Sequence, residues 1–255
     1  MQDQTDGTSN LALRDIRLTI SSGEKVAICG RTGSGKSSFI AFLLKLLDPI
    51  SSTAVNTTID DVPLHRIDRQ TLRQRIIAVP QEAVFLPDGS TIQNNLDPSD
   101  MSTPEECEAV LAAVGLWHFV LERGGLGTGM TAGTFSAGQR QLISVGRAIL
   151  RRRIRARNLH HMEGVSDGGI LLLDEVSSSV DHETERVIQD IIRTEFKDYT
   201  VIAVSHRLDM IMDFDRVVVM DAGEIVEVGK PTVLAGETGT RFGDLVRASG
   251  KERAR

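Results

Sequence analysis

The sequence of 255 residues has few cysteines, few aromatic residues and no long hydrophobic run. Its two cysteines, Cys29 and Cys107, are too few for a disulfide framework and do not form a metal-binding motif. No stretch approaches the roughly 20 apolar residues of a membrane-spanning helix, and no charged-then-apolar signal peptide opens the chain. The formal net charge of −6 argues against nucleic acid as the main partner. These features favour one cytosolic-type domain, or one core that carries a subdomain.

A glycine-rich motif follows the first strongly apolar segment. Residues 25–29 are predicted to form a buried strand, and a G-x-x-x-x-G-K-S motif follows directly. Its glycines let backbone N–H groups turn towards phosphate oxygens, and residues 38–44 continue as a predicted helix whose amino end favours anions. Lys36 is expected to reach the β- and γ-phosphates, and Ser37 to offer its hydroxyl to Mg²⁺. The predicted nucleotide-binding residues here are Gly30, Arg31, Thr32, Gly33, Ser34, Gly35, Lys36, Ser37 and Ser38.

A second apolar segment, residues 169–175, ends in two carboxylates, Asp174 and Glu175. A strand this apolar belongs in the middle of a parallel sheet, and ligands bind at the carboxyl ends of such strands. Asp174 is the predicted Mg²⁺-side and nucleotide-side carboxylate of a Walker B strand. Glu175 lies one residue further, where a carboxylate can polarise the water that attacks the γ-phosphate.

The hydrophobic pattern predicts an α/β core interrupted by a helical insert. Helical periodicity runs from residue 103 to about 153, and a tight turn at 221–223 joins the last two strands. The predicted strands cover residues 13–20, 25–29, 57–59, 76–79, 171–174, 200–205, 216–220 and 224–228. We therefore expect an α/β P-loop NTPase fold with a core of residues 1–81 and 165–255. The helical subdomain and a basic loop are expected within residues 82–164.

The segment at residues 135–141, Phe-Ser-Ala-Gly-Gln-Arg-Gln, lies between the two halves of this site. Ser136 is a natural helix N-cap, and Gln139 three residues later completes a capping box. The exposed amino end of such a helix attracts anions, and Gly138 lets a phosphate approach the backbone. Taken alone, an ordinary capped helix explains these residues equally well. Between two ATP-site motifs, the anion-binding interpretation is favoured.

This order of motifs resembles the nucleotide-binding domain of ATP-binding-cassette (ABC) proteins over nearly the whole chain. The resemblance implies a RecA-like core of the ABC type with antiparallel β elements, ATP and Mg²⁺ as cofactors, and ATP hydrolysis. In this family two such domains meet head to tail, and each signature segment covers the ATP held by the other. The residues that would serve the partner's ATP are Ser136, Ala137, Gly138 and Gln139. Phe135 and Ala137 depart from the common Leu-Ser-Gly-Gly-Gln form.

Three single residues agree with the resemblance. Gln81 follows the strand at 76–79 as the family's Q-loop glutamine does, which implies contact with Mg²⁺ or the attacking water. His206 ends the strand at 200–205, which matches the switch histidine at the γ-phosphate. Asp181 matches the D-loop aspartate, although Ser-Val replaces the usual Ala-Leu before it. The resemblance thus implies Glu175, His206 and Gln81 as catalytic residues, and Ser37, Gln81 and Asp174 as the Mg²⁺ site.

The segments at 79–81, 91–98 and 138–142 look like the second nucleotide-binding domain of multidrug-resistance-associated, subfamily C exporters, of a fungal type. Glu175 fits this assignment, because the second domain of these proteins keeps an intact catalytic base. The assignment implies transmembrane domains and a second nucleotide-binding domain as partners. It also implies a small-molecule substrate bound elsewhere, no nucleic acid, and a location at the cytoplasmic face of a membrane.

Two other function classes remain open. A soluble ABC ATPase of translation or DNA repair would usually bring tandem cassettes or long coiled-coil heptads, and the sequence has neither. A truncated nucleotide-binding regulator is opposed by Glu175 and His206. One absence leaves this hypothesis open: the family usually stacks adenine on an aromatic residue upstream of the phosphate loop, and no Phe, Tyr or Trp precedes Phe39 here. The strand that would carry such a ring is expected to be cut short near residues 4–7, so we expect a fragment or a truncated gene product that binds ATP weakly.

Two further segments are expected to lie outside the site. The basic run at residues 151–157 has seven residues of which five are arginine, and a solvated charge run in a mobile loop is favoured over contact with acidic lipid or a regulatory segment. The glycine-rich stretch at 124–129 lacks a preceding strand. We therefore expect it to be a flexible linker to the signature segment rather than a dinucleotide site.

Overall fold

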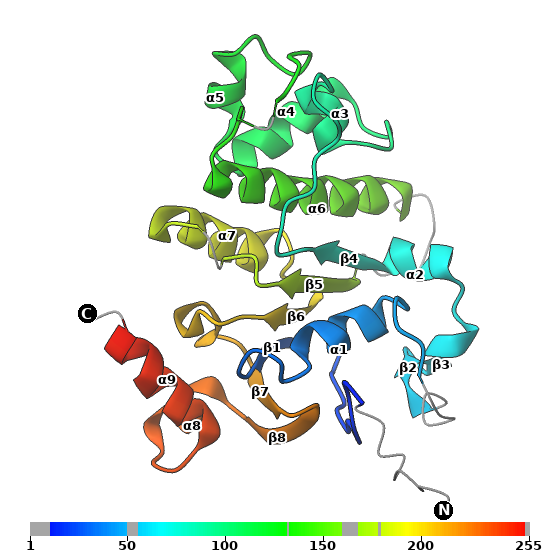
Figure 1. Cartoon of the computed structure of the whole chain (residues 1–255). Helices are drawn as coiled ribbons and strands as arrows, with labels where there is room; N and C mark the ends of the chain where they lie inside the picture. Colours follow the sequence, from blue (N-terminus) through cyan, green and yellow to red (C-terminus); the bar gives the residue numbers. More distant parts are fainter. Residues whose placement is uncertain (1–10, 50–55, 132, 160–167, 178–179, 253–255) are drawn as a thin grey trace, which may run out of the picture.

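The computed structural model describes residues 11–49, 56–131, 133–159, 168–177 and 180–252. Its centre is a six-stranded sheet in the order β4-β5-β6-β1-β7-β8 (Figure 1). The first five strands in this order run parallel, and β8 pairs antiparallel with β7. The strands of this sheet are β1 (Lys25–Cys29), β4 (Ile76–Val79), β5 (Ile170–Asp174), β6 (Thr200–Val204), β7 (Arg216–Asp221) and β8 (Glu224–Gly229). A separate hairpin joins β2 (Thr58–Ile59) and β3 (Val62–Pro63).

Helices cover both faces of the sheet. On one face α1 (Lys36–Leu43) and α2 (Arg69–Arg75) pack on it, and on the other α6 (Ala137–Leu159) and α7 (His182–Thr194) do so. Figure 1 shows α3, α4 and α5 on the far side of α6 from the sheet, and α8 and α9 near the C-terminus. The bounds of these helices are α3 (Ile92–Leu96), α4 (Pro104–Ala113), α5 (Trp117–Leu121), α8 (Pro231–Gly236) and α9 (Arg241–Glu252), and two short 3₁₀ helices cover Leu64–Arg66 and Leu208–Ile211.

The strand β1 illustrates why the central strands read as continuous apolar runs. Val26 and Ile28 pack into the core under α1 and α2, whereas Ala27 and Cys29 pack into the core under α6 and α7. Because side chains of a strand alternate between faces, a strand covered on both faces needs apolar residues at every position. The predicted α/β class with a parallel sheet is thus confirmed.

The predicted strand at residues 13–20 is wrong, because no ladder forms there. Asp15 has a φ of 43°, which breaks the extended conformation. Arg14 N donates to Gly223 O at 2.8 Å, but among the described residues no second backbone hydrogen bond follows it in the register of a ladder. Ile16 and Leu18 nevertheless pack against the core under α1. The apolar alternation was therefore a sign of packing and not of strand pairing. Residues 4–7, where a shortened strand was expected, lie outside the described residues.

The basic run at residues 151–157 was expected in a loop, but it continues α6 to Leu159. Arg152 and Arg153 both donate to the carboxylate of Glu195, at 2.8 Å and 2.6 Å, and Arg151 donates to the Arg73 carbonyl on α2 at 2.6 Å. These contacts replace the expected solvation. The run is a helical segment that ties α6 to the elements on either side of it, and the expected loop up to residue 167 lies mostly outside the described residues.

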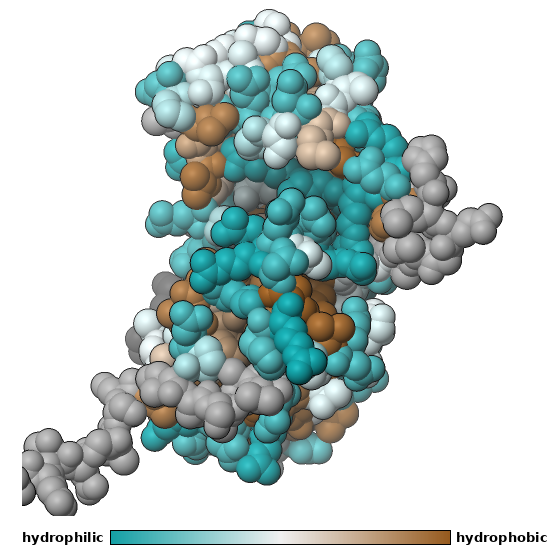
Figure 2. All heavy atoms as spheres, turned by 90° about the vertical axis from the view of Figure 1, so that its right-hand side faces the viewer, coloured by the Kyte–Doolittle hydropathy of each residue, from teal (hydrophilic) through white to brown (hydrophobic). Residues whose placement is uncertain are grey.

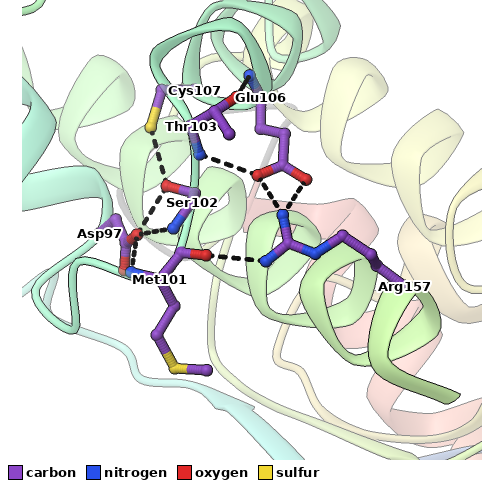
Figure 3. A network of polar contacts seen from close by, with 7 residues as sticks. All are labelled: Asp97, Met101, Ser102, Thr103, Glu106, Cys107 and Arg157. Atoms are coloured by element: carbon purple, nitrogen blue, oxygen red, sulfur yellow. Dashed lines mark hydrogen bonds and ion pairs between the residues drawn. The ribbon is translucent and has the colours of Figure 1, made fainter.

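The last arginine of that run holds the start of α4 (Figure 3). Arg157 donates to both carboxylate oxygens of Glu106, at 2.7 and 2.8 Å. Glu106 and Thr103 form a capping box at the amino end of α4. In the same network Asp97 accepts hydrogen bonds from the backbone and the hydroxyl of Ser102, at 2.7 and 2.6 Å. The network joins the ends of α3, α4 and α6.

The glycine-rich stretch at residues 124–129 is an ordered turn and not a flexible linker. The carbonyls of Leu126 and Thr128 accept hydrogen bonds from Gln93 and Ile92, both at 3.0 Å, and Leu126 is buried. Gly125 has a φ of 84°, a conformation that glycine adopts without strain. The stretch therefore docks on α3.

Figure 2 shows the α2 side of the molecule, where hydrophilic residues predominate and hydrophobic ones form scattered groups. Within the part of the chain that the structure describes, none of the helices combines the length and the apolar character needed to cross a bilayer.

Candidate functional site

The residues predicted for ATP binding lie at one edge of the sheet. Strand β1 ends before the phosphate loop, β5 ends at Asp174, β6 ends just before Ser205 and His206, and β4 ends two residues before Gln81. Since β4, β5, β6 and β1 are parallel neighbours in that order, their carboxyl ends meet along the same edge. The structure thus brings together four segments that are separated in the sequence, which follow β1, β4, β5 and β6.

The phosphate loop closes on its own lysine. Lys36 is buried, and its Nζ donates to the carbonyls of Gly30 and Arg31, both at 3.0 Å. Gly35 begins α1 with a φ of 103°. A Cβ atom added at Gly30 would lie 2.3 Å from the Met220 carbonyl oxygen, so only glycine fits there. The loop geometry thus depends on glycine at both ends.

The other loop residues differ in their exposure. Ser34 is buried, and its hydroxyl has no hydrogen-bond partner within the described residues. Ser38 is half-buried beside it on α1. The exposed positions, which are open to a ligand, are Arg31, Thr32, Gly33 and Ser37.

The two carboxylates at the end of β5 lie close to Lys36. Burial raises the pKa of Asp174, the charge of Glu175 raises it further, and the charge of Lys36 opposes both. Burial lowers the pKa of Lys36, and the charges of Glu175 and Asp174 oppose that change. The Oδ1 atom of Asp174 is buried and has no hydrogen-bond partner among the described residues. The site thus holds more negative than positive charge and an unpaired oxygen.

Glu175 is held by its backbone in an uncommon conformation. Its φ is 48°, and its N–H donates to the Val204 carbonyl at 2.9 Å. The side chain turns to His206, whose Nε2 lies 2.9 Å from Glu175 Oε1. A positive φ at a non-glycine residue is uncommon and often marks a functional site. The backbone therefore directs this carboxylate towards the end of β6.

The predicted capping box of the signature segment is confirmed. Ser136 N donates to Gln139 Oε1 at 2.9 Å, and Gln139 N donates to Ser136 Oγ at 3.2 Å. Ser136 and Ala137 are exposed. A Cβ atom added at Gly138 would lie 3.1 Å from Thr184 Oγ1 on α7, so the start of α6 rests on the start of α7.

Asp181 is the N-cap of α7. Its Oδ1 accepts from Thr184 N at 2.9 Å, and its Oδ2 accepts from Thr184 Oγ1 at 3.0 Å. These hydrogen bonds hold the pKa of Asp181 below its ordinary value. The serines at 178 and 179, which belong to the predicted D-loop, lie outside the described residues. In the described part, the signature segment adjoins Asp181 rather than Lys36.

Sequence reasoning missed two residues of α6 that hold the segment around Gln81. Gln141 Nε2 donates to the Pro80 carbonyl at 3.2 Å. Arg147 donates to the carbonyls of Asn95 and Val84. Gln141 is buried beside the apolar stripe of Leu142, Val145 and Ile149, and a polar residue at such a position is the signal that could have identified it. Arg147 lies on the other side of the helix, where the sequence carries no such signal.

The comparisons with known proteins agree with this geometry. The family model described as "ABC transporter" matches residues 13–154. The chain is 64% identical to the ABC-type transporter braE of Annulohypoxylon truncatum and 51% identical to the ABC transporter FGM5 of Gibberella zeae. These matches cover 97% and 95% of this chain but only 17% and 16% of the two relatives. The chain therefore spans about a sixth of their length.

A solved structure shows the same fold. It is described as the structure of a bacterial Atm1-family ABC exporter with ATP bound, and it aligns with a TM-score of 0.79 at 25% identity. The alignment covers 93% of this chain and 39% of that chain. Together with the family model and the fungal relatives, this match establishes that the chain belongs to the ABC transporter family.

Proposed function

We propose that this chain binds Mg²⁺–ATP at the carboxyl edge of its sheet and hydrolyses it. The observation that carries the proposal is the meeting of Lys36, Asp174, Glu175 and His206 at that edge. A lysine on a phosphate loop supplies charge for the phosphates, and a carboxylate paired with a histidine supplies a base. The proposed nucleotide contacts are Gly30 to Ser38 and Asp174.

The residues present fit a divalent cation. The buried, unpaired Oδ1 of Asp174 and the raised pKa of its carboxyl both mark a carboxylate whose charge Lys36 balances only in part. Mg²⁺ is usually held by one or two protein oxygens together with phosphate oxygens, and Asp174, Ser37 and Gln81 are the residues that would hold it. When bound, it neutralises charge that develops on the phosphates. That arrangement would also give Asp174 the partner that the protein does not supply.

The mechanism follows from the groups around Glu175. Glu175 takes a proton from the attacking water while the new oxygen–phosphorus bond forms and the bond to the ADP oxygen breaks. In the nucleotide-free chain, His206 Nε2 lies 2.9 Å from Glu175 Oε1 and holds that carboxylate. When ATP binds, the N–H of His206 would donate to the γ-phosphate instead. Lys36 exchanges its two carbonyl partners for phosphate oxygens. Gln81, two residues after the end of β4, would contact Mg²⁺ or the attacking water.

The wider assignment rests on the relatives. We propose that the chain is the second nucleotide-binding domain of a fungal, subfamily C-like exporter, at the cytoplasmic face of a membrane. Two fungal relatives are named as transporters, and the solved neighbour is described as an exporter with ATP bound. Transmembrane domains and a first nucleotide-binding domain would be its partners. The transported small molecule would bind to those other parts.

Within the chain, we propose a core of residues 1–81 and 165–255 and a signature subdomain of residues 82–164. The signature residues Ser136 to Gln139 would cover the ATP of the partner domain. Asp181 would lie at the same interface, because it adjoins Gly138.

The function is tested by replacing Glu175 with glutamine. The amide keeps the size of the side chain but cannot accept the proton of water, so we expect ATP turnover to fall at least about a hundredfold. Binding of a fluorescent ATP analogue with Mg²⁺ should stay within about threefold, because Lys36 and Asp174 are unchanged. Turnover equal to that of the unchanged chain would refute the role of Glu175.

A further inference from the structure

A single side chain connects the histidine segment to the D-loop. Arg207 directly follows His206, and its two terminal nitrogens reach different elements. Nη1 donates to Glu185 Oε2 at 2.7 Å, and Nη2 donates to the Val180 carbonyl at 2.6 Å. Val180 immediately precedes Asp181, the N-cap of α7. One planar guanidinium thus fixes the backbone before α7 and a side chain within α7 at the same time.

The partner carboxylate is unusual for its burial. The Glu185 side chain is only 5% exposed, whereas that of Arg207 is 24% exposed. Glu185 Oε2 also lies 3.2 Å from His182 Nδ1, and Glu185 Oε1 has no hydrogen-bond partner within the described residues. A buried charge with so few partners is costly for the fold. Its presence points to a role other than stability.

The backbone around His206 is anchored on both sides. Ser205 Oγ donates to the Arg207 carbonyl and accepts from the Arg207 N–H, both at 3.0 Å. His206 therefore lies between two residues that are locked to each other, and its own side chain pairs with Glu175. The hydrogen bond from Arg207 to the Val180 carbonyl and the two hydrogen bonds between Ser205 and Arg207 thus form a continuous link from Val180 to the backbone on both sides of His206.

We propose that Arg207 and Glu185 are a positioning pair that couples the D-loop to the Glu175–His206 pair. The D-loop end of this link adjoins the signature, since Asp181 and Thr184 lie against Gly138. The pair thus relates the position of the signature and D-loop of this chain to the geometry of its own hydrolytic base. The inference rests on the proposed ATPase function and adds two residues that do not touch the nucleotide.

The test measures kcat, KM and thermal stability for Arg207→Ala, Glu185→Gln and Arg207→Lys in the whole chain. Since the pair acts on the geometry of the base and not on nucleotide binding, kcat of Arg207→Ala should fall about tenfold or more with KM within about twofold. Arg207→Lys should be intermediate, because an ammonium lacks the planar fork of the guanidinium. Glu185→Gln combined with Arg207→Ala should be no worse than Arg207→Ala alone.

Two further variants separate positioning from stability. Arg193 lies on α7, the helix that also carries Glu185. Arg193→Ala removes its exposed ion pair with Asp213 and should leave kcat within about twofold. Glu185→Leu with Arg207→Met replaces both charges with apolar groups of similar volume, which often keeps a fold stable, and should still lose kcat. Normal kcat in that double variant, or a loss in Arg207→Ala that only follows the folded fraction, would overturn the proposal. If the protein without substitutions does not hydrolyse Mg²⁺–ATP, that result would instead overturn the proposed function itself.

Discussion

At the scale of single residues, the site is organised around an imbalance of charge. Lys36 faces two carboxylates, Asp174 and Glu175, and burial acts against the charged form of Lys36 and of Asp174. Lys36 meets its hydrogen-bonding needs with two loop carbonyls, while Asp174 Oδ1 has no partner among the described residues. The nucleotide-free chain therefore carries a cost that a cation and phosphates would offset.

This imbalance predicts the behaviour of Asp174→Asn. Because the folded state raises the pKa of Asp174, its charge destabilises the nucleotide-free fold at neutral pH. The amide removes that charge, so we expect the variant to unfold at a higher temperature, with a gain of about 1 kcal/mol. The gain should shrink as pH falls through the raised pKa of the folded state, and it should vanish below the unfolded pKa of about 3.9, where the carboxyl is protonated in both states. Thermal unfolding at pH 7 and pH 4 measures it.

The same variant should lose the stabilisation that Mg²⁺–ATP gives to the unchanged chain. A ligand at about a hundred times its Kd stabilises a protein by about 2.7 kcal/mol. We expect most of that stabilisation to depend on Asp174, which would hold the metal. Asp198→Asn is the matched control, since Asp198 is exposed in the turn before β6 and should change neither quantity. A variant that Mg²⁺–ATP still stabilises fully would contradict the assignment of Asp174.

At the scale of elements, sequence patterns predicted the buried strands well and the contacts of charged segments poorly. The bounds predicted for β1 and β4 are those observed, because strands covered on both faces need an unbroken apolar run. Alternation at residues 13–20 was misread, since an extended segment can pack its apolar side without pairing. The positions of Gln81, Asp174, Glu175 and His206 followed from strand ends. The partners of Arg207 did not, because Glu185 and Val180 lie 22 and 27 residues away in the chain.

The basic run was misjudged for a related reason. A charge run is solvated in the absence of partners, and the partners here lie on other elements. Burial alone would raise the pKa of Glu195, but the hydrogen bonds and charges of Arg153 and Arg152 outweigh it and hold that pKa below its ordinary value. Glu195 is the C-cap residue of α7, so its ion pairs with Arg152 and Arg153 join α6 to α7.

That contact predicts a loss of stability for Arg153→Ala. The variant leaves Glu195 Oε1 without the donor now 2.6 Å away, and a hydrogen bond to a charged group contributes about 2 kcal/mol. We expect urea unfolding at pH 7 to show that loss. Since the carboxylate stabilises the fold above its unfolded pKa of about 4.3 and loses this effect as pH falls through the lower folded value, the difference should shrink in acid.

Arg186→Ala is the control for that experiment, because Arg186 is exposed on α7 and its loss should change stability by less than about 0.5 kcal/mol. If Arg153→Ala and this control have the same free energy of unfolding, the arginines of residues 151–157 would again be interpreted as a solvated charge run.

At the scale of the whole molecule, the chain carries two halves of different ATP sites. The phosphate loop and Glu175 lie at the carboxyl edge of the sheet, whereas Ser136 and Ala137 are exposed at the start of α6, beside Asp181. The capping hydrogen bonds of Ser136 and Gln139 satisfy only part of the helix end. An exposed helix start with free N–H groups suits an anion that another molecule presents.

Two inactive variants can therefore complement each other. Ser136→Asp keeps an N-capping side chain but sets a carboxylate against the phosphates of the partner's ATP, so we expect it to fold normally and to lose turnover. Lys36→Ala loses its own ATP site but keeps its signature. The experiment uses a second copy of this chain in place of the first nucleotide-binding domain. If two copies pair head to tail, one of the two sites in each mixed pair has an intact phosphate loop and an intact signature. We expect about a quarter of the turnover of the unchanged chain from an equal mixture, since half of the pairs are mixed and each holds one working site.

ATPase activity measured against the mixing ratio should peak near equal amounts. If Ser136→Asp alone turns over ATP at the unchanged rate, the signature does not take part in the site, and each chain hydrolyses ATP by itself.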